Sequence, residues 1–180
     1  LFGALEAVKL NQNFGSESIQ LFEFGKIYQK FESGYSEQKM LSLVLSGSKE
    51  PESWNGQKDK FDFFALKGLV WSIFEKLGIL KNHQEVGTNN ELLEDGLTLQ
   101  IAKKQIAHIG WIGKDLKKHF GIKNDVFYAE INWDLVIECI NMNKVKFREI
   151  PKFPAVTRDL SLLIDEQISF GDLSEVASSC

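Results

Sequence analysis

The chain has 180 residues, of which 43% are hydrophobic and 26% are charged, and its formal net charge at pH 7 is −4. This composition is typical of a soluble globular protein, and a chain of this length buries enough surface, roughly 70%, to fold without a disulfide or a structural metal. No apolar run approaches the ~20 residues of a membrane helix, and the acidic balance argues against a domain whose whole surface binds nucleic acid.

The first third of the sequence predicts a helix followed by two strands. Leu1, Leu5 and Val8 recur at helical spacing within the first twelve residues. Residues 19–28 are rich in branched and aromatic side chains and predict a strand. Because apolar residues occur on both faces of this strand, we expect it to be covered on both sides. Residues 40–45 alternate in the manner of a second strand.

The clearest predicted helix follows a polar loop over residues 49–60. Asp62 is a suitable N-cap, and Gly78 stands where a left-handed residue ends a helix. Apolar residues repeat between them at the helical period: Phe63, Leu66, Val70, Ile73, Phe74 and Leu77. The aromatic side chains of this region form either a stacking surface or part of the core, and their helical spacing favours the core. They are Phe61, Phe63, Phe64, Trp71 and Phe74.

The next segment predicts a polar, irregular stretch over residues 81–96 and then a β-hairpin. Residues 97–102 and 106–112 alternate between apolar and polar, although the turn between them lacks a glycine. Three further elements are predicted, a helix, a strand and a helix, over residues 114–120, 126–131 and 133–140. Since no regular β-α-β repeat is present, the pattern predicts an α+β fold: an antiparallel β-sheet flanked by helices.

Positive charge is concentrated near the C-terminal end of the chain. The residues of this basic patch are Lys144, Lys146, Arg148, Lys152 and Arg158. Such a cluster either lies near RNA, with an affinity that falls as salt rises, or is a solvated linker. The sequence leaves both readings open, with the linker somewhat favoured.

A domain boundary is predicted within this basic stretch. Residues 156–164 alternate as a strand, and residues 170–177 begin a helix. A strand and part of a helix cannot close a core. We therefore expect a first domain over residues 1–147, the start of a second over residues 148–180, and a longer parent protein.

Four segments of the chain, in the same order, resemble the β chain of bacterial-type phenylalanyl-tRNA synthetases. They are Leu21 to Tyr28 (LFEFGKIY), Asp62 to Gly68 (DFFALKG), Ile109 to Gly113 (IGWIG) and Phe153 to Leu160 (FPAVTRDL). Each segment alone is a weak signal, and the last is the most specific. Together they cover nearly the whole chain.

The resemblance implies a class II aminoacyl-tRNA synthetase-like, catalytically inactive core over residues 1–147. Residues 148–180 would then be the first strand and helix of a ferredoxin-like anticodon-binding domain. The implied partners are the catalytic α subunit, in an α2β2 heterotetramer, and tRNA(Phe), with no membrane and no DNA. ATP and Mg²⁺ would bind outside this segment of a cytoplasmic enzyme.

The arginine content bears on the catalysis that the resemblance implies. Class II aminoacylation needs cations that grip a triphosphate, and the planar guanidinium group binds phosphate bidentately. The chain has two arginines, Arg148 and Arg158, and both lie outside the predicted core. We therefore expect no catalytic residue, no cofactor-binding residue and no metal ligand in this chain, and we expect it to be inactive alone.

Other sequence patterns are weaker evidence for a functional site. The three histidines, His83, His108 and His119, lack the spacing of a metal site. The residues Gly110 to Lys114 lack the spacing of a phosphate-binding loop and instead indicate a tight turn into a helix. Two further functions stay open: a freestanding RNA- or protein-binding module and an independent amino-acid-activating enzyme. The apolar helix face of Leu1, Leu5 and Val8 is the candidate subunit interface.

Overall fold

The structure, a computed structural model, describes residues 1–49, 59–79, 83–88, 90–142, 156–165, 168 and 170–179. The chain divides into two compact units, Leu1–Val145 and Lys146–Cys180. None of the helices in the described ranges is long and apolar enough to cross a membrane.

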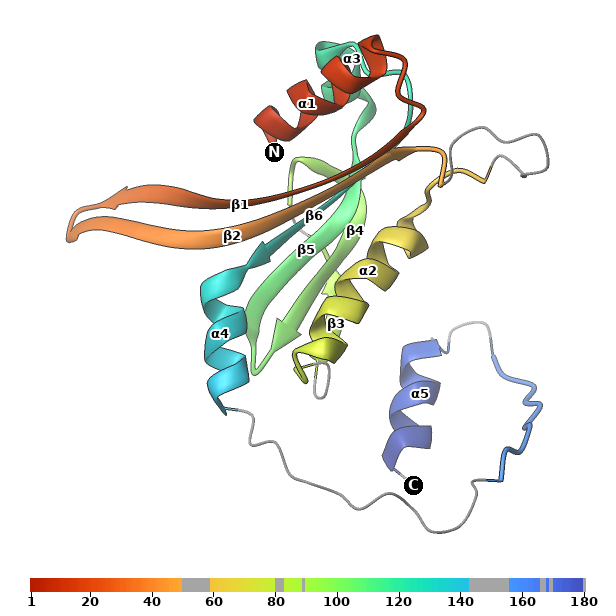
Figure 1. The fold of residues 1–180 in the computed structure, drawn as a ribbon. Helices are drawn as coiled ribbons and strands as arrows, with labels where there is room; N and C mark the ends of the chain where they lie inside the picture. Colours follow the sequence, from red (N-terminus) through yellow and green to blue (C-terminus); the bar gives the residue numbers. More distant parts are fainter. Residues whose placement is uncertain are drawn as a thin grey trace. The chain divides into compact units, whose positions relative to one another are not determined.

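One antiparallel sheet organises the first unit (Figure 1). Within the described residues it has six strands in the order β1-β2-β6-β5-β4-β3, and every neighbouring pair is antiparallel. The strands are β1 (Ser18–Phe31), β2 (Gly34–Gly47), β3 (His83–Gly87), β4 (Leu93–Ile101), β5 (Lys104–Ile112) and β6 (Val126–Asn132). The predicted antiparallel sheet with flanking helices is therefore confirmed.

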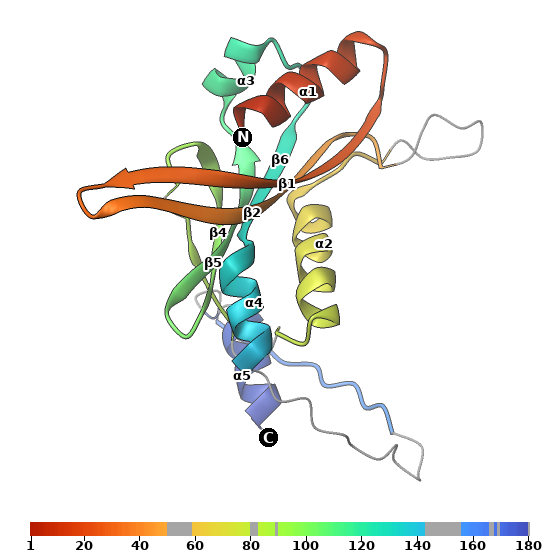
Figure 2. The ribbon, with the colours of Figure 1, turned by 60° about the vertical axis from the view of Figure 1, so that its left-hand side comes forward.

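Two helices, α2 (Phe63–Lys76) and α4 (Trp133–Met142), cover one face of the sheet, and Figure 2 shows them side by side. We call this the helix-covered face. Asp62 caps α2 as predicted, since its Oδ1 accepts a hydrogen bond of 2.7 Å from the Ala65 amide. Gly78 ends the helix with φ of +69°, also as predicted. The fully buried Leu66, Val70 and Phe74 fill the space between α2 and the sheet.

The remaining aromatic side chains of this region mostly join the same core. Phe61, Phe63 and Trp71 are partly buried and pack against it, whereas Phe64 is 75% exposed. The prediction that helical spacing places these rings in the core is thus confirmed for all but Phe64. Phe64 lies on the outer side of the helix, next to the Phe63 ring.

The opposite face of the sheet is covered at one end by α1 (Phe2–Asn13) and α3 (Lys114–Phe120). Phe2 stacks on Phe120, and Lys9 Nζ donates a hydrogen bond of 2.8 Å to the Gly121 carbonyl. A second apolar cluster lies beneath them and consists of Leu5, Val8, Ile19, Val44, Leu93, Ile112, Ile122, Val126 and Tyr128.

This second cluster corrects the predicted subunit interface. Leu5 and Val8 are fully buried inside the chain, and Leu1 packs against the same cluster. Their helical periodicity arises because α1 covers the sheet of its own chain. The large apolar side chains that α1 leaves exposed are Phe2 and Leu10.

The β4–β5 hairpin turns without glycine. Ala102 and Lys103 take its two turn positions with φ of +49° and +66°, the left-handed conformation that such a turn demands. Behind the turn the pairing shifts by one residue, because Leu99 faces Ala107 while Gln100 faces Gln105. Gln100 and Gln105 pair directly and lie on the same side of the hairpin, and the bulge puts Gln105 on the side of His108.

Two glycines face each other farther along this hairpin. Gly96 pairs with Gly110, and both are buried. A Cβ on Gly96 would lie 2.1 Å from the Ile109 carbonyl oxygen, and one on Gly110 would lie 2.3 Å from the Asp95 carbonyl oxygen. The strands can approach this closely only because neither residue has a side chain.

The strands β1 and β2 continue past the sheet as a two-stranded ribbon, seen in Figure 1 as the long hairpin that leaves the other strands. The pairing of β2 with β6 ends at Met40, so residues 26–39 pair only with each other. We call residues 26–39 the arm. The prediction that residues 19–28 are covered on both sides is wrong within this chain, since Phe22 and Tyr28 are 72% and 66% exposed.

Two other predictions need correction. Residues 81–96 are not irregular throughout, because β3 forms the edge of the sheet and β4 begins at Leu93. In the second unit, α5 (Phe170–Ser179) confirms the predicted helix. Residues 156–164, however, form no strand, and their apolar side chains are exposed. A strand needs a hydrogen-bonded neighbour, and none is described for this segment.

Candidate functional site

The face of the sheet opposite α2 and α4 is open beyond the end that α1 covers, and a row of polar residues crosses it. The strand pairings place these residues side by side, one on each strand from β1 to β4 in sheet order. They are Glu23, Ser42, Glu130, His108 and Thr98. Strand register therefore creates this polar row from five separate segments of sequence.

Hydrogen bonds fix the side chains at the centre of the row. His108 Nδ1 and Thr98 Oγ1 share a hydrogen bond of 2.9 Å, and Thr98 is almost completely buried. The Tyr128 hydroxyl, two residues before Glu130 on β6, donates a hydrogen bond of 3.1 Å to Glu130 Oε1. Burial lowers the pKa of His108 below its usual value, against the opposing effect of the Glu130 charge. Burial, reinforced by Glu130, raises the pKa of Tyr128 well above its usual range.

The polar row is acidic and holds no lysine or arginine. Glu23 and Glu130 supply its two carboxylates. On β1 and β2, the lysines nearest to the row are Lys26 and Lys39. Their side chains point to the other side of the ribbon, because successive strand residues point to opposite faces. A triphosphate placed on this row would meet negative charge and no guanidinium group.

A shallow cavity of about 460 Å³ adjoins the row at the β3 edge. Its lining is formed by Val86, Gly87, Asn90, Thr98, Gln100, Gln105 and His108. These groups offer amide, hydroxyl and imidazole hydrogen bonds without a fixed charge. Gln100 reaches this cavity by strand alternation two residues after Thr98, and the bulge brings Gln105 to it.

We expect His108 to make the stability of the protein depend on pH. Its folded-state pKa is depressed, so between that value and its ordinary value near 6.5 the unfolded chain binds more protons than the folded chain. Stability should therefore fall as the pH drops below about 6.5. In urea titrations between pH 7.5 and 5, a His108→Gln variant should lose less stability than the wild type. If His108→Gln lost as much stability as the wild type over this pH range, the expectation would be contradicted.

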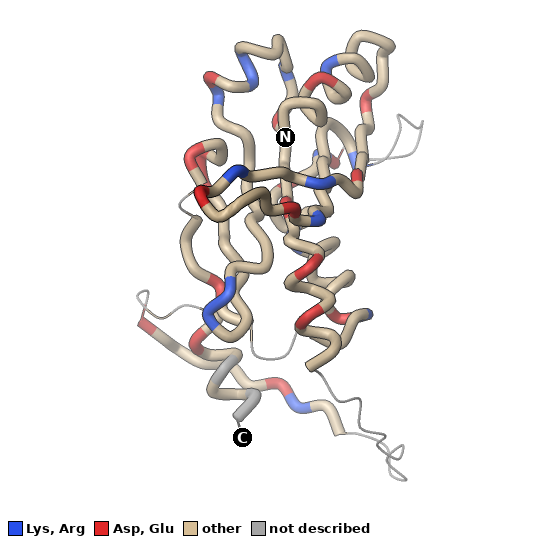
Figure 3. Tube along the Cα trace, turned by 90° about the vertical axis from the view of Figure 1, so that its left-hand side faces the viewer, with Lys and Arg blue, Asp and Glu red and all other residues tan. Residues whose placement is uncertain are grey.

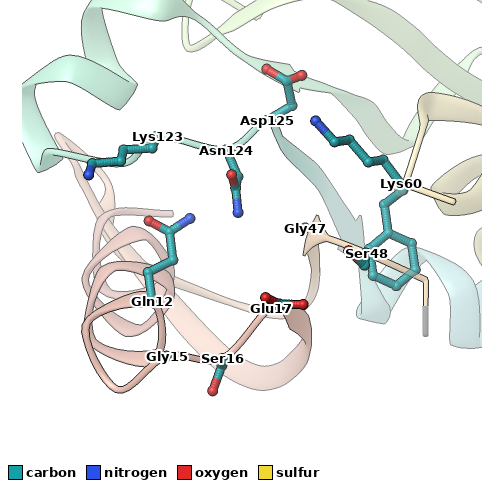
Figure 4. Close-up of a pocket in the computed structure, with 11 residues that line it drawn as sticks. Gln12, Gly15, Ser16, Glu17, Gly47, Ser48, Lys60, Lys123, Asn124 and Asp125 are labelled. Atoms are coloured by element: carbon teal, nitrogen blue, oxygen red, sulfur yellow. The ribbon is translucent and has the colours of Figure 1, made fainter. Parts of the chain in front are cut away.

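A second cavity, of about 530 Å³, lies near the C-terminal end of α1 (Figure 4). Its wall carries both signs of charge, with Glu17 and Asp125 near Lys60 and Lys123. Asp125 also forms an ion pair with Lys117, with 2.5 Å between Oδ1 and Nζ. Figure 4 shows Gln12 among the side chains that enter this space, and its buried Nε2 has no hydrogen-bond partner among the described residues. This mixed lining selects neither an anion nor a cation.

The predicted basic patch falls mostly outside the described residues. Lys144, Lys146, Arg148 and Lys152 lie in the segment from 143 to 155, which is not described. Arg158 belongs to the second unit and is exposed. The proximity of this patch to RNA therefore stays a prediction.

The remaining sequence patterns have structural explanations. His83 lies edge-on to Trp71, and His119 lies edge-on to Phe120. In the part of the chain that the structure describes, no three His, Cys, Asp or Glu side chains lie close enough together to hold a metal ion. The segment from Gly110 to Lys114 leads into a helix as predicted, but not through a turn at Gly110, because β5 continues to Ile112 and α3 begins after Gly113.

Sequence reasoning missed the polar row and the arm. The neighbours of His108 in the row, Thr98 and Glu130, come from other strands. The alternation of aromatic and basic residues along residues 22–30 was visible in the sequence. The same alternation predicts a strand covered on both faces, because a pattern of side chains does not reveal whether the chain supplies a covering layer.

Comparison with known proteins assigns the chain to a family. A family model described as "Phenylalanyl tRNA synthetase beta chain CLM domain" matches residues 1–133. The chain is 33% identical over 188 residues to the phenylalanine–tRNA ligase beta subunit of Bacteroides fragilis, which covers 98% of this chain. It is 29% identical over 191 residues to the protein of the same name from Porphyromonas gingivalis, which covers 100% of this chain. In both cases the chain spans 23% of the relative's length.

Solved structures with the same fold include pyrrolysyl-tRNA synthetase from Desulfitobacterium hafniense, with a TM-score of 0.59. That likeness covers 78% of this chain and 48% of the other, at 15% sequence identity, so it concerns the fold alone. It confirms the predicted class II synthetase-like fold. With the family match over residues 1–133, these findings show that the chain belongs to the phenylalanyl-tRNA synthetase β chain family.

Proposed function

We propose that this chain is a non-catalytic core of the phenylalanine–tRNA ligase β subunit, and that it supports the catalytic α subunit and the binding of tRNA(Phe) during ATP-dependent aminoacylation. The observation that carries the proposal is the acidic polar row of Glu23, Ser42, Glu130, His108 and Thr98 on the open sheet face. A class II-like sheet whose open face bears carboxylates and no guanidinium group is suited to support rather than to nucleotide activation.

Phosphate binding depends on local cations, and the polar row itself offers none. Residues 1–147 contain no arginine, and the lysines beside the row either point to its opposite side or are engaged elsewhere. Lys104, at the end of β5, bonds Glu138 of α4 at 2.6 Å. The negative charges of a nucleotide would therefore meet the carboxylates of the row without a compensating cation.

The partners follow from the family and are part of the proposal. An α2β2 heterotetramer places ATP and Mg²⁺ on the α subunit, outside this segment. Residues 148–180 would begin a ferredoxin-like anticodon-binding domain, to which the exposed Arg158 belongs. The enzyme would work in the cytoplasm.

The test uses the full-length β chain, alone and combined with the α chain. We expect the two chains to form a heterotetramer by light scattering, and we expect ATP–pyrophosphate exchange only when the α chain is present. A double substitution in the row, Glu23→Gln with Glu130→Gln, should leave the exchange rate of the assembled enzyme within about twofold.

Two results would contradict the proposal. One is phenylalanine-dependent exchange by the β chain alone. The other is loss of exchange in the Glu23→Gln, Glu130→Gln enzyme when light scattering shows an intact tetramer, because that result would place the row in the reaction.

A further inference from the structure

The two faces of the arm differ in chemistry. Strand pairing puts Lys26 opposite Lys39, Tyr28 opposite Glu37, and Lys30 opposite Tyr35. These six residues share one face, which continues the helix-covered face of the sheet. The other face carries Ile27, Gln29, Phe31, Gly34, Ser36 and Gln38 and holds no charged residue. We call the first of these the basic–aromatic face.

The rings of the basic–aromatic face are open to solvent. Tyr28 is 66% exposed and Tyr35 is 80% exposed. The same face continues toward the sheet with Phe22 and Phe24, which are 72% and 57% exposed, although Phe24 also touches Trp133 edge-on at 5.0 Å. Four rings therefore follow one side of the ribbon.

Lysines alternate with these rings. Figure 3 shows basic residues on both strands of the arm. Lys30 Nζ lies 5.9 Å from the Tyr35 ring centre, and Lys26 bonds Glu37 at 2.7 Å. Alternate residues on one side of a strand lie about 6.7 Å apart, so a flat group stacked on Tyr28 has a lysine on either side of it. The face carries three lysines and one glutamate in a chain whose net charge is −4.

This combination fits an unpaired nucleic-acid strand better than a protein surface. Single-strand binders join aromatic platforms, on which bases stack, to cations that follow the phosphates. Protein interfaces are also rich in aromatic residues, but their centres are depleted of lysine. The uncharged opposite face of the same ribbon shows that the lysines are not simply spread along the arm for solubility.

We propose that the basic–aromatic face of the arm binds single-stranded RNA, with bases stacked on Tyr28 and Tyr35 and phosphates near Lys30 and Lys39. This inference deepens the proposed function, on which it rests for the identity of the RNA, because it assigns an RNA-binding role to the core itself. The binding is sequence-tolerant, since stacking and charge do not read base edges.

The test measures the binding of a fluorescein-labelled, 12-nucleotide single-stranded RNA to the assembled enzyme by anisotropy. Tyr28→Ala and Tyr35→Ala should each weaken binding about tenfold. Lys30→Gln combined with Lys39→Gln should reduce the slope of log affinity against log salt by about 1.4, because each phosphate that a lysine no longer neutralises accounts for about 0.7 of the slope. Photocrosslinking of the same RNA carrying 4-thiouridine should label the peptide of residues 26–39.

The matched control replaces residues of the opposite face, with Gln29→Ala combined with Phe31→Ala, and should leave RNA affinity within about twofold. The proposal would be overturned if substitutions on the two faces lowered RNA affinity equally, or if the tyrosine variants bound RNA as the wild type does. If the tyrosine variants kept RNA affinity but no longer bound the α chain, the arm would be a protein interface instead. Failure of the wild-type chains to assemble would contradict the proposed function, whereas weaker RNA binding alone would not.

Discussion

Replacing Phe74 with alanine is expected to lower the free energy of unfolding by about 3–5 kcal/mol. Phe74 is fully buried and is the largest such side chain in the described part of the chain. It joins α2 to the sheet within the cluster that also contains Leu66 and Ile109. Its removal loses the transfer free energy of the ring and leaves a cavity that the surrounding strands cannot fill.

The measurement is urea unfolding followed by circular dichroism, with thermal melting as a second probe. A loss of this size corresponds to a fall of roughly 10 °C in Tm for a protein of this length. Phe64→Ala is the matched control, because Phe64 lies on the same helix but is 75% exposed. It should change stability by less than about 0.5 kcal/mol. Similar losses in both variants would show that α2 does not pack as described.

Replacing Gly96 with alanine is expected to destabilise the protein by about 2–3 kcal/mol. The added Cβ would lie 2.1 Å from the Ile109 carbonyl oxygen and 2.7 Å from the Gly110 Cα. Both are backbone atoms of the neighbouring strand, so no side-chain rotation relieves the clash. The strands β4 and β5 must move apart, and ladder hydrogen bonds beside Gly96 lengthen or break.

The control for Gly96→Ala is Gly25→Ala. Gly25 also lies in a strand, but a Cβ there would meet nothing within 4 Å, and an alanine usually costs less conformational entropy than a glycine. Gly25→Ala should therefore be neutral or slightly stabilising in the same urea titrations. Amide hydrogen exchange should locate the effect of Gly96→Ala at β4 and β5. An unchanged midpoint for Gly96→Ala would mean that the two strands are farther apart than the structure shows.

Elements with a local cause could be predicted from the sequence. The helix from Phe63 to Lys76 combines an Asp62 cap, an apolar stripe and a terminal Gly78, and each signal acts within a few residues. The short helix before Gly121 is ended in the same way by a left-handed glycine, with φ of +66°. Such signals need no knowledge of the rest of the fold.

Elements that depend on distant partners were harder to predict. The strand β3 has a polar sequence, HQEVG, and forms because the edge of β4 is available to it. Residues 156–164 have a clear strand pattern but no described partner. Periodicity reports which side chains alternate, whereas pairing decides whether a strand exists.

The candidate site could be predicted only in part. The missing guanidinium groups follow from counting arginines, and this count needs no structure. The polar row could not be derived, because it requires the register that places Ser42 beside Glu130 and His108 beside Thr98. A shift of one residue in any of these pairings would move a row member to the opposite face.

The position of β6 at the middle of the sheet has a consequence for the order of folding. The hairpins β1–β2 and β4–β5 pair residues close in sequence, and each can form early. The last strand of the sheet to leave the ribosome is β6, and it joins both hairpins by pairing with β2 on one side and β5 on the other. Until residues 126–132 emerge, the nascent chain holds two separate halves with unpaired edges, a state in which a chaperone would be expected to bind.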